Sequence, residues 1–360
     1  MDLIKIKVLI IQPKIPHYRI EFFLQISKLY KLTILHSGTY IKNYENNFKQ
    51  LTWPIRKIGP FKFFTRNLHK LCNNYDVVII EANIRYLDRN FLIMNPFRKY
   101  KWISWGPGVT SSYNKKYDSN EFLNRFRYFI FKHADANIFY SDYPLIKYIK
   151  AGIKPEKLFV APNTTHVTFN NGITFKKNKL IFVGTLYKQK GLFELLDAYK
   201  EVYKENKNII KPLVIVGQGP EYDRIMYWIK DNNLEDLITL TGPIYDHTIL
   251  EKYFREAYAC ISPGQAGLTV LTSMGYGTPF ITRKNAITGG EIFNIEHGVN
   301  GILYNNSEEL KEIIVDIINN PGKYIEMGER ARQYYLKNRQ IENMVNVFKD
   351  AVEFVKNNTY

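Results

Sequence analysis

The sequence is poor in cysteine and lacks any long apolar run. Only Cys72 and Cys260 occur among its 360 residues, and neither stands in a pattern typical of metal or redox sites. Two such cysteines fit a reducing compartment better than a disulfide framework. The opening MDLIKIKVLIIQP resembles the start of a signal peptide, but its apolar run is short and closes at Pro13 instead of a small-residue cleavage site. No stretch approaches the roughly 18 apolar residues of a membrane span, so we expect a soluble, cytoplasmic protein.

Metal and nucleotide motifs of several enzyme classes are also missing. The seven histidines are scattered and no Asp-x-Asp ends an apolar strand, so no metal site is predicted. The segment VGQGPEYD supplies Gly217 and Gly219 but no third glycine, and no acid ends the next strand to hold a ribose. The lysine-containing phosphate loop of NTPases is absent as well. These absences argue against a dinucleotide oxidoreductase and a P-loop enzyme.

Acidic residues are scarce in the first half of the chain only. Residues 1–170 contain 27 Lys and Arg against 11 Asp and Glu, whereas residues 171–360 contain 23 of each. A compositional bias of the genome would act on both halves, so the asymmetry suggests that the first half meets a polyanion. Its basic residues are dispersed and match no nucleic-acid-binding module. We therefore favour an anionic membrane surface and predict no nucleic-acid partner.

Short apolar strands alternate with amphipathic helical segments along the chain. The predicted strands are KIKVLIIQP, KLTILH, YDVVIIEA, KWISWG and ADANIFYS, followed by NKLIFVG, KPLVIVG, LITLTG and AYACIS. Strands separated by helices indicate parallel sheets covered on both faces. The pattern runs twice, with a linker at 162–179. The sequence thus predicts an α/β protein with two Rossmann-like, doubly wound domains, 1–165 and 166–340, that face a cleft.

Each strand predicted in the second half runs into glycine at or just after its end. Glycine lets the backbone approach a ligand closely, and a following helix N-terminus offers free N–H groups to a phosphate. Four such loops in one domain favour a phosphate-bearing ligand. The four glycines are Gly184, Gly217, Gly242 and Gly264.

The order of these loops resembles that of the retaining glycosyltransferases of family 4, which have the GT-B fold. FVGTLYKQKG is similar to the family's VGRLxxxKG, VIVGQGP to xxGxGP, and LTSMGYGTPFIT to LEAMAxGxPVIA. GGEIFNIEHGVNGILY is similar to xPEIVxxGxNGxL, and IPHYRIEFF in the first half also looks like a family segment. The resemblance covers nearly all of residues 3–340. It implies a hexosyltransferase-like enzyme that uses a nucleoside-diphosphate sugar as co-substrate, with no metal and no other cofactor.

The resemblance also implies roles for particular residues. Lys190 would neutralise the leaving diphosphate and Glu291 would face the donor sugar, and these two are the expected catalytic residues. The expected substrate-binding residues of the second half are Gly184, Thr185, Gly217, Gly242, Pro243, Ile244, Gly264, Gly267, Leu268, Thr269 and Thr272. Those of the first half are His17, Gly106, Gly108 and Asn163.

The segment SPGQAGLTVLTSMGYGTP, residues 262–279, departs from the family because it contains no charged residue. The family usually has two glutamates here, as EGFGxxxxE, and on alignment they fall at Gly264 and Thr272. Thr185 likewise stands where the family has arginine. One interpretation is a degenerate GT-B protein that binds sugar or nucleotide without catalysis. The other is a branch in which neutral groups take over the hydrogen bonds. A GT-B epimerase or a phosphorylase would share the fold.

The acceptor side is expected in the basic first half. Its segments NIRYLDRNFLIMNPFRKYKW and FLNRFRYFIFKH mix Lys and Arg with aromatics, as surfaces seated on lipid headgroups do. We expect a glycan or lipid-linked acceptor in bacterial envelope polysaccharide synthesis, such as lipopolysaccharide O-antigen, capsule or exopolysaccharide, with peripheral binding to the anionic inner membrane face. Residues 341–357 carry a helical apolar stripe. By resemblance, this helix is expected to cross back and pack on the first domain.

Overall fold

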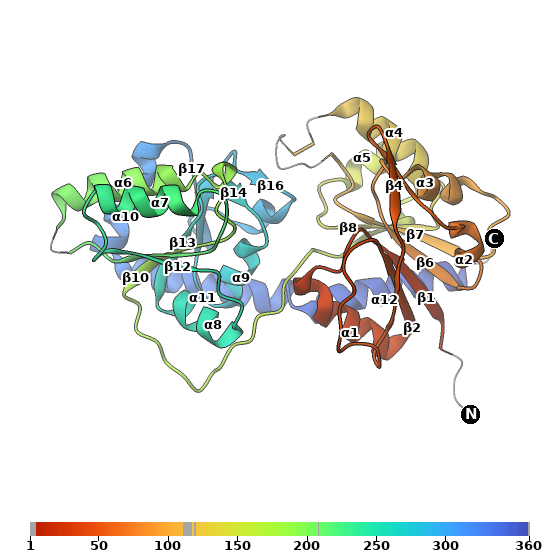
Figure 1. The fold of residues 1–360 in the computed structure, drawn as a ribbon, viewed down its shortest axis with the longest axis horizontal. Helices are drawn as coiled ribbons and strands as arrows, with labels where there is room; N and C mark the ends of the chain where they lie inside the picture. Colours follow the sequence, from red (N-terminus) through yellow and green to blue (C-terminus); the bar gives the residue numbers. More distant parts are fainter. Residues whose placement is uncertain (1–4, 111–116, 119, 208, 359–360) are drawn as a thin grey trace. The chain divides into compact units, whose positions relative to one another are not determined.

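The computed structural model describes residues 5–110, 117–118, 120–207 and 209–358. Contacts group the chain into two compact units (Figure 1). The first contains Met1–Thr110, Asp118–Thr164 and Ile341–Tyr360, and the second contains Thr165–Gln340. Each unit is described by itself below.

The first unit is built on a seven-stranded sheet in which every neighbouring pair is parallel. The strand order is β3-β2-β1-β6-β7-β8-β9. Short runs of Val, Ile and Leu form the central strands because both faces of a parallel sheet are covered. The bounds are β1 Lys7–Ile11, β2 Lys31–His36, β3 Lys49–Thr52, β6 Val77–Glu81, β7 Lys101–Gly106, β8 Ala136–Phe139 and β9 Leu158–Val160.

Two layers of helices cover this sheet. Helices α1 (Ile20–Leu29) and α12 (Ile341–Asn357) share one buried apolar cluster against it. The rings of Phe348 and Phe22 lie 4.8 Å apart within that cluster, so α12 completes the core of the first unit. The opposite face is covered by α2 Leu68–Cys72, α3 Leu87–Met94, α4 Glu121–Phe131 and α5 Leu145–Lys150 (Figure 1). A hairpin of β4 (Ile55–Ile58) and β5 (Phe61–Phe64) packs beside α3.

The second unit repeats the plan with six parallel strands in the order β12-β11-β10-β13-β15-β17. Their bounds are β10 Lys179–Val183, β11 Leu213–Val216, β12 Ile238–Gly242, β13 Ala257–Ile261, β15 Phe280–Arg283 and β17 Gly301–Tyr304. One face packs on α6 Leu192–Glu205, α7 Tyr222–Asp231 and α10 Ser307–Asn319. The other packs on α8 His247–Arg255, α9 Thr269–Gly275 and α11 Pro321–Asn338.

The predicted fold class is confirmed, since both units have parallel sheets between helical layers. The structure adds short strands that the sequence analysis did not predict, among them β3, β9, β15 and β17. Residues 162–178, within the predicted linker, form neither helix nor strand. Among the described residues, no helix combines the length and apolarity needed to cross a membrane.

Candidate functional site

The ends of three neighbouring strands of the second unit meet through glycine backbones. The N–H of Gly184, after β10, donates to the carbonyl of Val216 at 3.0 Å, and the N–H of Gly217 donates to that of Gly242 at 2.9 Å. A Cβ added at Gly217 would lie 1.9 Å from the carbonyl oxygen of Gly184. Because no side chain fits there, the loops after β10 and β11 come into direct backbone contact. Gly217 and Gly242 are buried and Gly184 is half-buried, so the carboxyl ends of these strands form a closely packed edge of glycine backbone.

Lys190 places an ammonium group on this edge. It ends the 3₁₀ turn η3 (Lys188–Lys190), and only 6% of its surface is exposed. Its Nζ lies 3.2 Å from the position that a Cβ of Gly184 would take. Within the part of the chain that the structure describes, no group accepts a hydrogen bond from this ammonium. Burial lowers the pKa of Lys190 to about 8, and the negative charge of Glu291 opposes part of that change. An unpaired buried cation of this kind calls for an anion.

The loop between β13 and α9 packs against the same turn. The N–H of Gly264 donates to the carbonyl of Lys190 at 2.9 Å. A Cβ added at Gly264 would lie only 2.2 Å from the carbonyl oxygen of Gln189. Position 264 therefore has no room for a side chain in this structure, and the acid expected there by resemblance could not be accommodated without moving the backbone.

Gln265 and Tyr187 are polar residues of this region that the sequence analysis missed. The Tyr187 hydroxyl donates to Oε1 of Gln265, which is buried. The Lys190 ammonium lies 6.0 Å from the centre of the Tyr187 ring. Gln265 directly follows the position where an acid is missing, and that adjacency was the available sequence signal. The pair puts neutral hydrogen-bonding groups beside the ammonium.

Glu291 reaches the site through a two-stranded ladder. Strands β14 (Gln265–Ala266) and β16 (Ile287–Thr288) pair in parallel, and the 3₁₀ helix η4 (Glu291–Asn294) follows the second strand. The N–H of Gly289 donates to Oε2 of Glu291 at 2.9 Å. This bond holds the carboxylate on its own loop, and its charge acts on Lys190. The two expected catalytic residues thus belong to one electrostatic environment.

The hydroxyls of the two α9 threonines that were predicted to bind substrate are turned toward the backbone. Thr272 Oγ1 donates to the carbonyl of Leu268 at 3.3 Å, and Thr269 Oγ1 donates to that of Val183 at 3.4 Å. Both oxygens keep lone pairs for a ligand but not their protons. Helix α9 has seven residues and Leu268 at its N-cap, with Gly267 just before it. So short a helix contributes only a small dipole.

The remaining predicted residues of the second unit lie on the rim of the strand ends. Thr185 is exposed next to Gly184, and Pro243 is exposed after Gly242. Ile244 packs against the apolar cluster formed by α8, α9 and α11. Their positions leave Thr185 and Pro243 open to solvent beside the glycine backbones.

Four predicted residues belong to the first unit. His17 is exposed at the start of the 3₁₀ turn η1 (His17–Arg19), and Asn163 follows β9. Gly106 ends β7. Gly108 has a packing role, because an added Cβ would lie 2.8 Å from side-chain atoms of two neighbouring residues.

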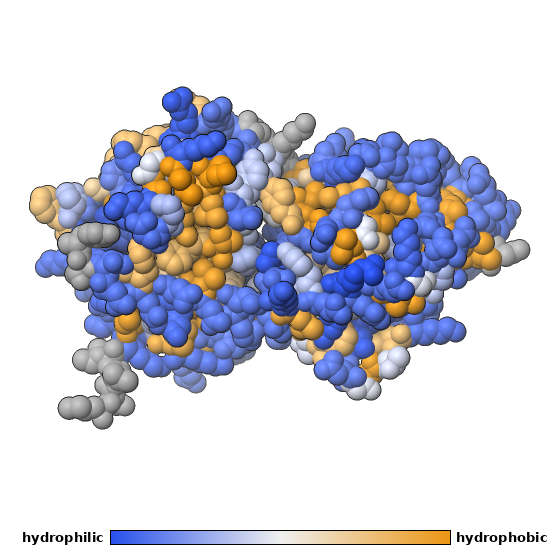
Figure 2. Space-filling model, turned by 180° about the vertical axis from the view of Figure 1, so that it is seen from behind, coloured by the Kyte–Doolittle hydropathy of each residue, from blue (hydrophilic) through white to orange (hydrophobic). Residues whose placement is uncertain are grey.

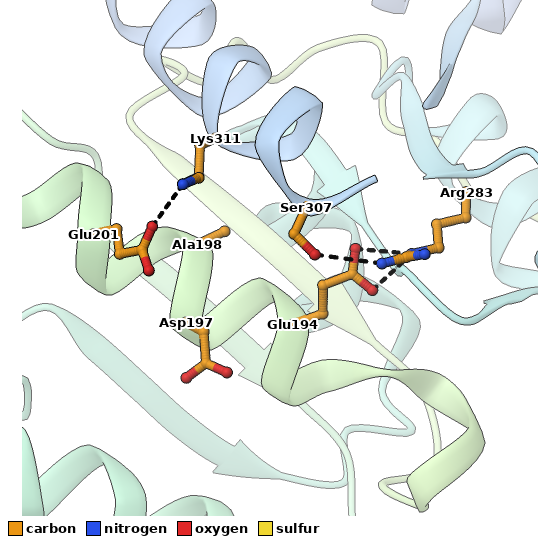
Figure 3. A pocket seen from close by; sticks show the side chains of 7 residues that line it. All are labelled: Glu194, Asp197, Ala198, Glu201, Arg283, Ser307 and Lys311. Carbon is orange, nitrogen blue, oxygen red and sulfur yellow. Dashed lines mark hydrogen bonds and ion pairs between the residues drawn. The ribbon is translucent and has the colours of Figure 1, made fainter. Parts of the chain in front are cut away.

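A surface pocket of about 380 Å³ lies between α6 and α10 of the second unit, with Arg283 at the end of β15 also lining it (Figure 3). Four of its five charged side chains pair with one another. Arg283 Nε donates to both carboxylate oxygens of Glu194, and Lys311 on α10 pairs with Glu201 on α6 at 2.7 Å. Figure 3 shows these side chains directed at each other across the pocket. The two ion pairs fasten α6 to Arg283 and to α10, and Asp197 adds a further negative charge to the lining, so the described lining offers no unpaired cation like that of Lys190.

Comparison with known proteins relates the fold and the second unit of this chain to glycosyltransferases. Residues 164–334 match the family model described as glycosyl transferases group 1. Solved structures with the same fold include the Anabaena protein HepE in complex with UDP, at a TM-score of 0.72 and 15% identity, covering 96% of this chain and 99% of that one. A glycosyltransferase from Rickettsia africae has a TM-score of 0.73 at 13% identity, covering 99% and 100%. The chain therefore has the GT-B fold, and its second unit carries the group 1 pattern.

Sequence comparison identifies individual relatives of this chain. An uncharacterized glycosyltransferase of Methanocaldococcus jannaschii is 27% identical over 384 residues, which cover 97% of this chain and 90% of that protein. The alpha-monoglucosyldiacylglycerol synthase of Acholeplasma laidlawii is 25% identical over 186 residues, covering 49% of this chain and 44% of that protein. This chain is similar to glycosyltransferases over its whole length.

Proposed function

We propose that the protein is a retaining, metal-independent glycosyltransferase of family 4 that moves a sugar from a nucleoside-diphosphate sugar to a glycan or lipid-linked acceptor. The observation that carries the proposal is the buried ammonium of Lys190, which has no acceptor among the described residues and lies against the glycine backbone at Gly184. A diphosphate supplies the missing anion. No cofactor besides the co-substrate is needed in this proposal.

The chemistry follows from charge. Departure of the nucleoside diphosphate puts negative charge on the oxygen that leaves the anomeric carbon, and a fixed cation there stabilises the transition state. Lys190 is the residue that we assign to this task. Glu291 faces the donor sugar, and its carboxylate favours the oxocarbenium character that develops there. The acceptor attacks on the face from which the diphosphate leaves, and a phosphate oxygen takes the acceptor's proton, so the protein need not supply a base.

The acceptor proposal draws on the charge of the first half and on the relatives. The name of the Acholeplasma laidlawii synthase describes a lipid acceptor, and another relative is an amylovoran biosynthesis glycosyltransferase of Erwinia amylovora. With 27 basic against 11 acidic residues in residues 1–170, we assign this chain to envelope polysaccharide or glycolipid synthesis. It works in the cytoplasm, at the anionic inner face of the membrane.

A second candidate is a GT-B protein that binds nucleotide sugar without transferring it. The observation that favours this alternative is the backbone contact at Gly264, which excludes the acid expected there. Thr272 also uses its proton within its own helix. Tyr187 and Gln265 are the neutral groups that could replace the acids in an active enzyme.

Binding and turnover assays separate these candidates. The full-length chain is mixed with a panel of nucleoside-diphosphate sugars, beginning with UDP-glucose because three of the structural neighbours were solved with UDP or its sugars. A shift in melting temperature identifies the donor. Release of nucleoside diphosphate that depends on a lipid or glycan acceptor supports transfer, and nuclear magnetic resonance of the product reports the anomeric configuration. Binding without release supports the second candidate, and an epimerised donor indicates an epimerase. If no nucleotide sugar binds, the proposal fails.

A further inference from the structure

Helix α4 in the first unit carries a stripe of phenylalanines on its outer face. Phe122 is 79% exposed, and Phe126 and Phe129 are also exposed, so three phenylalanines at helical spacing line the solvent face. The opposite face buries Ile130 and Phe131 together with Asn124 and Arg127. A surface helix ordinarily buries its apolar stripe and exposes its polar residues. Helix α4 has a second, exposed apolar stripe besides the buried one, which marks its outer face as a contact surface.

Polar contacts fix this orientation of the helix. Asn124 Oδ1 accepts from the N–H of Thr110 at 2.8 Å and from the guanidinium of Arg127 at 2.6 Å. The Asn124 amide donates to Asp118, which also accepts from Lys147 of α5. Turning the three phenylalanines inward would break this network and leave buried polar groups unpaired, which is unfavourable. The outward direction of the aromatic stripe is therefore built into the unit.

Neighbouring elements extend the apolar surface. The rings of Tyr128 and Tyr148 lie 4.9 Å apart and hold α5 against α4. On α5, Ile146 and Ile149 are exposed. Phe97, just after α3, is 86% exposed. Figure 2 shows hydrophobic surface gathered on the first unit, drawn at the left, with hydrophilic side chains bordering it. Exposed apolar side chains gathered on neighbouring elements mark an interaction site.

The charges around this surface are predominantly positive. Arg125 and Lys132 alternate with the phenylalanines on the exposed side of α4, and Lys150 is exposed on α5. The first half of the chain also holds the whole excess of +16. A second copy of the chain would bring this positive border against itself, which is unfavourable. An anionic bilayer complements both the basic border and the aromatic stripe.

We infer that the outer face of α4 and α5 is a membrane-docking surface, in which Phe122, Phe126 and Phe129 enter the headgroup region of an anionic bilayer while Arg125 and Lys132 contact lipid phosphates. The inference deepens the proposed function, because it specifies how the membrane partner of that proposal is held. It assigns the main contact to Phe122, Arg125, Phe126 and Phe129 of α4 and to Lys132 directly after that helix.

The test is co-sedimentation of the full-length chain with phosphatidylcholine vesicles that either contain or lack phosphatidylglycerol. The unmodified protein should bind the anionic vesicles, and binding should fall as salt is added. A variant with Phe122, Phe126 and Phe129 all changed to Gln should lose about tenfold or more in partitioning, since it loses its apolar insertion. Arg125→Gln and Lys132→Gln should each lower partitioning about fivefold at low salt, the effect of about one surface charge.

A matched control changes Met226 and Tyr227 to Gln, because these residues are likewise exposed on helix α7 of the second unit. This control should bind vesicles as the unmodified chain does. In a second readout, Phe126→Trp should give a fluorescence blue shift on anionic vesicles, whereas Tyr227→Trp should not.

Several results would overturn the inference. Equal vesicle binding by the triple variant and the control would show that the aromatic stripe is not the contact. A dimer that the triple variant converts to monomer, without vesicle binding by either form, would assign the surface to a second copy. Nucleotide binding by the triple variant is measured alongside, so that failed docking is distinguished from failure of the proposed donor site. Unchanged melting temperature of the triple variant shows that the fold is intact.

Discussion

Replacing Lys190 by methionine tests the donor site because the change should stabilise the fold and weaken the binding of nucleoside diphosphate. The side chain keeps nearly the same length and loses only its charge. Because burial lowers the pKa of Lys190 from 10.5 to about 8, the folded protein holds this proton less tightly than the unfolded chain. At pH 7, below both values, the ammonium is charged in both states and destabilises the fold. The gap between the two pKa values corresponds to about 3 kcal/mol.

Lys190→Met should therefore raise the free energy of unfolding at pH 7 by up to about 3 kcal/mol, measured by urea denaturation. The advantage should shrink as the pH rises from 8 to 10.5, since the native lysine then loses its charge in the folded state first. The same change should weaken nucleoside-diphosphate binding by about 2 kcal/mol, or roughly thirtyfold, the value of a charge-assisted hydrogen bond. Isothermal titration calorimetry with UDP measures the second effect.

The pH dependence of binding gives an independent check. In the unmodified protein, UDP affinity should fall above pH 8 and level off about thirtyfold lower once Lys190 has lost its charge, because the neutral lysine no longer supplies the charge-assisted hydrogen bond. The Lys190→Met variant should show no such fall. Lys188→Met is the matched control, since Lys188 is exposed on the same 3₁₀ turn, and it should change neither stability nor binding. A Lys190→Met protein that binds UDP normally, or that is less stable than the native chain, would refute the reasoning.

Three further predictions follow from the packing and the charges. Glu291→Gln should lower turnover by about tenfold or more while leaving UDP affinity within a few-fold, and equal loss in both would contradict the assignment to the donor sugar. Gly264→Ala should cost about 1–3 kcal/mol, since its Cβ would meet the carbonyl of Gln189 at 2.2 Å. Gly267→Ala, with open space around it, should leave the free energy of unfolding unchanged, and similar losses in both variants would argue against the close approach. Phe348→Ala should destabilise the first unit by about 3–5 kcal/mol, because its ring is fully buried, and a loss below about 1 kcal/mol in urea unfolding would contradict its place in the core.

The long apolar strands and the glycines that end them were predictable, because an apolar run and the glycine after it are both visible in a short stretch of sequence. The central strands β1, β2 and β10 lie within segments of Val, Ile and Leu that both sheet faces must bury. Strand β9 has three residues and β3 mixes Lys, Gln and Thr. Such short segments are strands only because a neighbouring strand offers its hydrogen bonds, which the sequence does not reveal.

The candidate site was predictable in its loops but not in its contacts. Glycine after each strand indicated a ligand edge. That Gly264 approaches the carbonyl of Gln189, and that Lys190 is buried without an acceptor among the described residues, depend on packing between distant segments. The aromatic residues of α4 posed the same difficulty, because phenylalanines occur on both of its faces. Asn124 and Arg127 decide which face turns inward, and their partners lie outside the helix or one turn away.

The membership of α12 in the first unit has a consequence for biosynthesis. Phe348 and Val352 fill the core beside α1, yet they follow Thr165–Gln340, which makes up most of the second unit, along the chain. During synthesis on the ribosome, the strands and helices of the first unit emerge early. Part of their apolar surface stays uncovered until α12 has also been synthesised. The second unit has all its segments sooner and can fold first, which reverses the usual order from N-terminus to C-terminus. The earlier unit therefore has the longer exposure to chaperones and to aggregation.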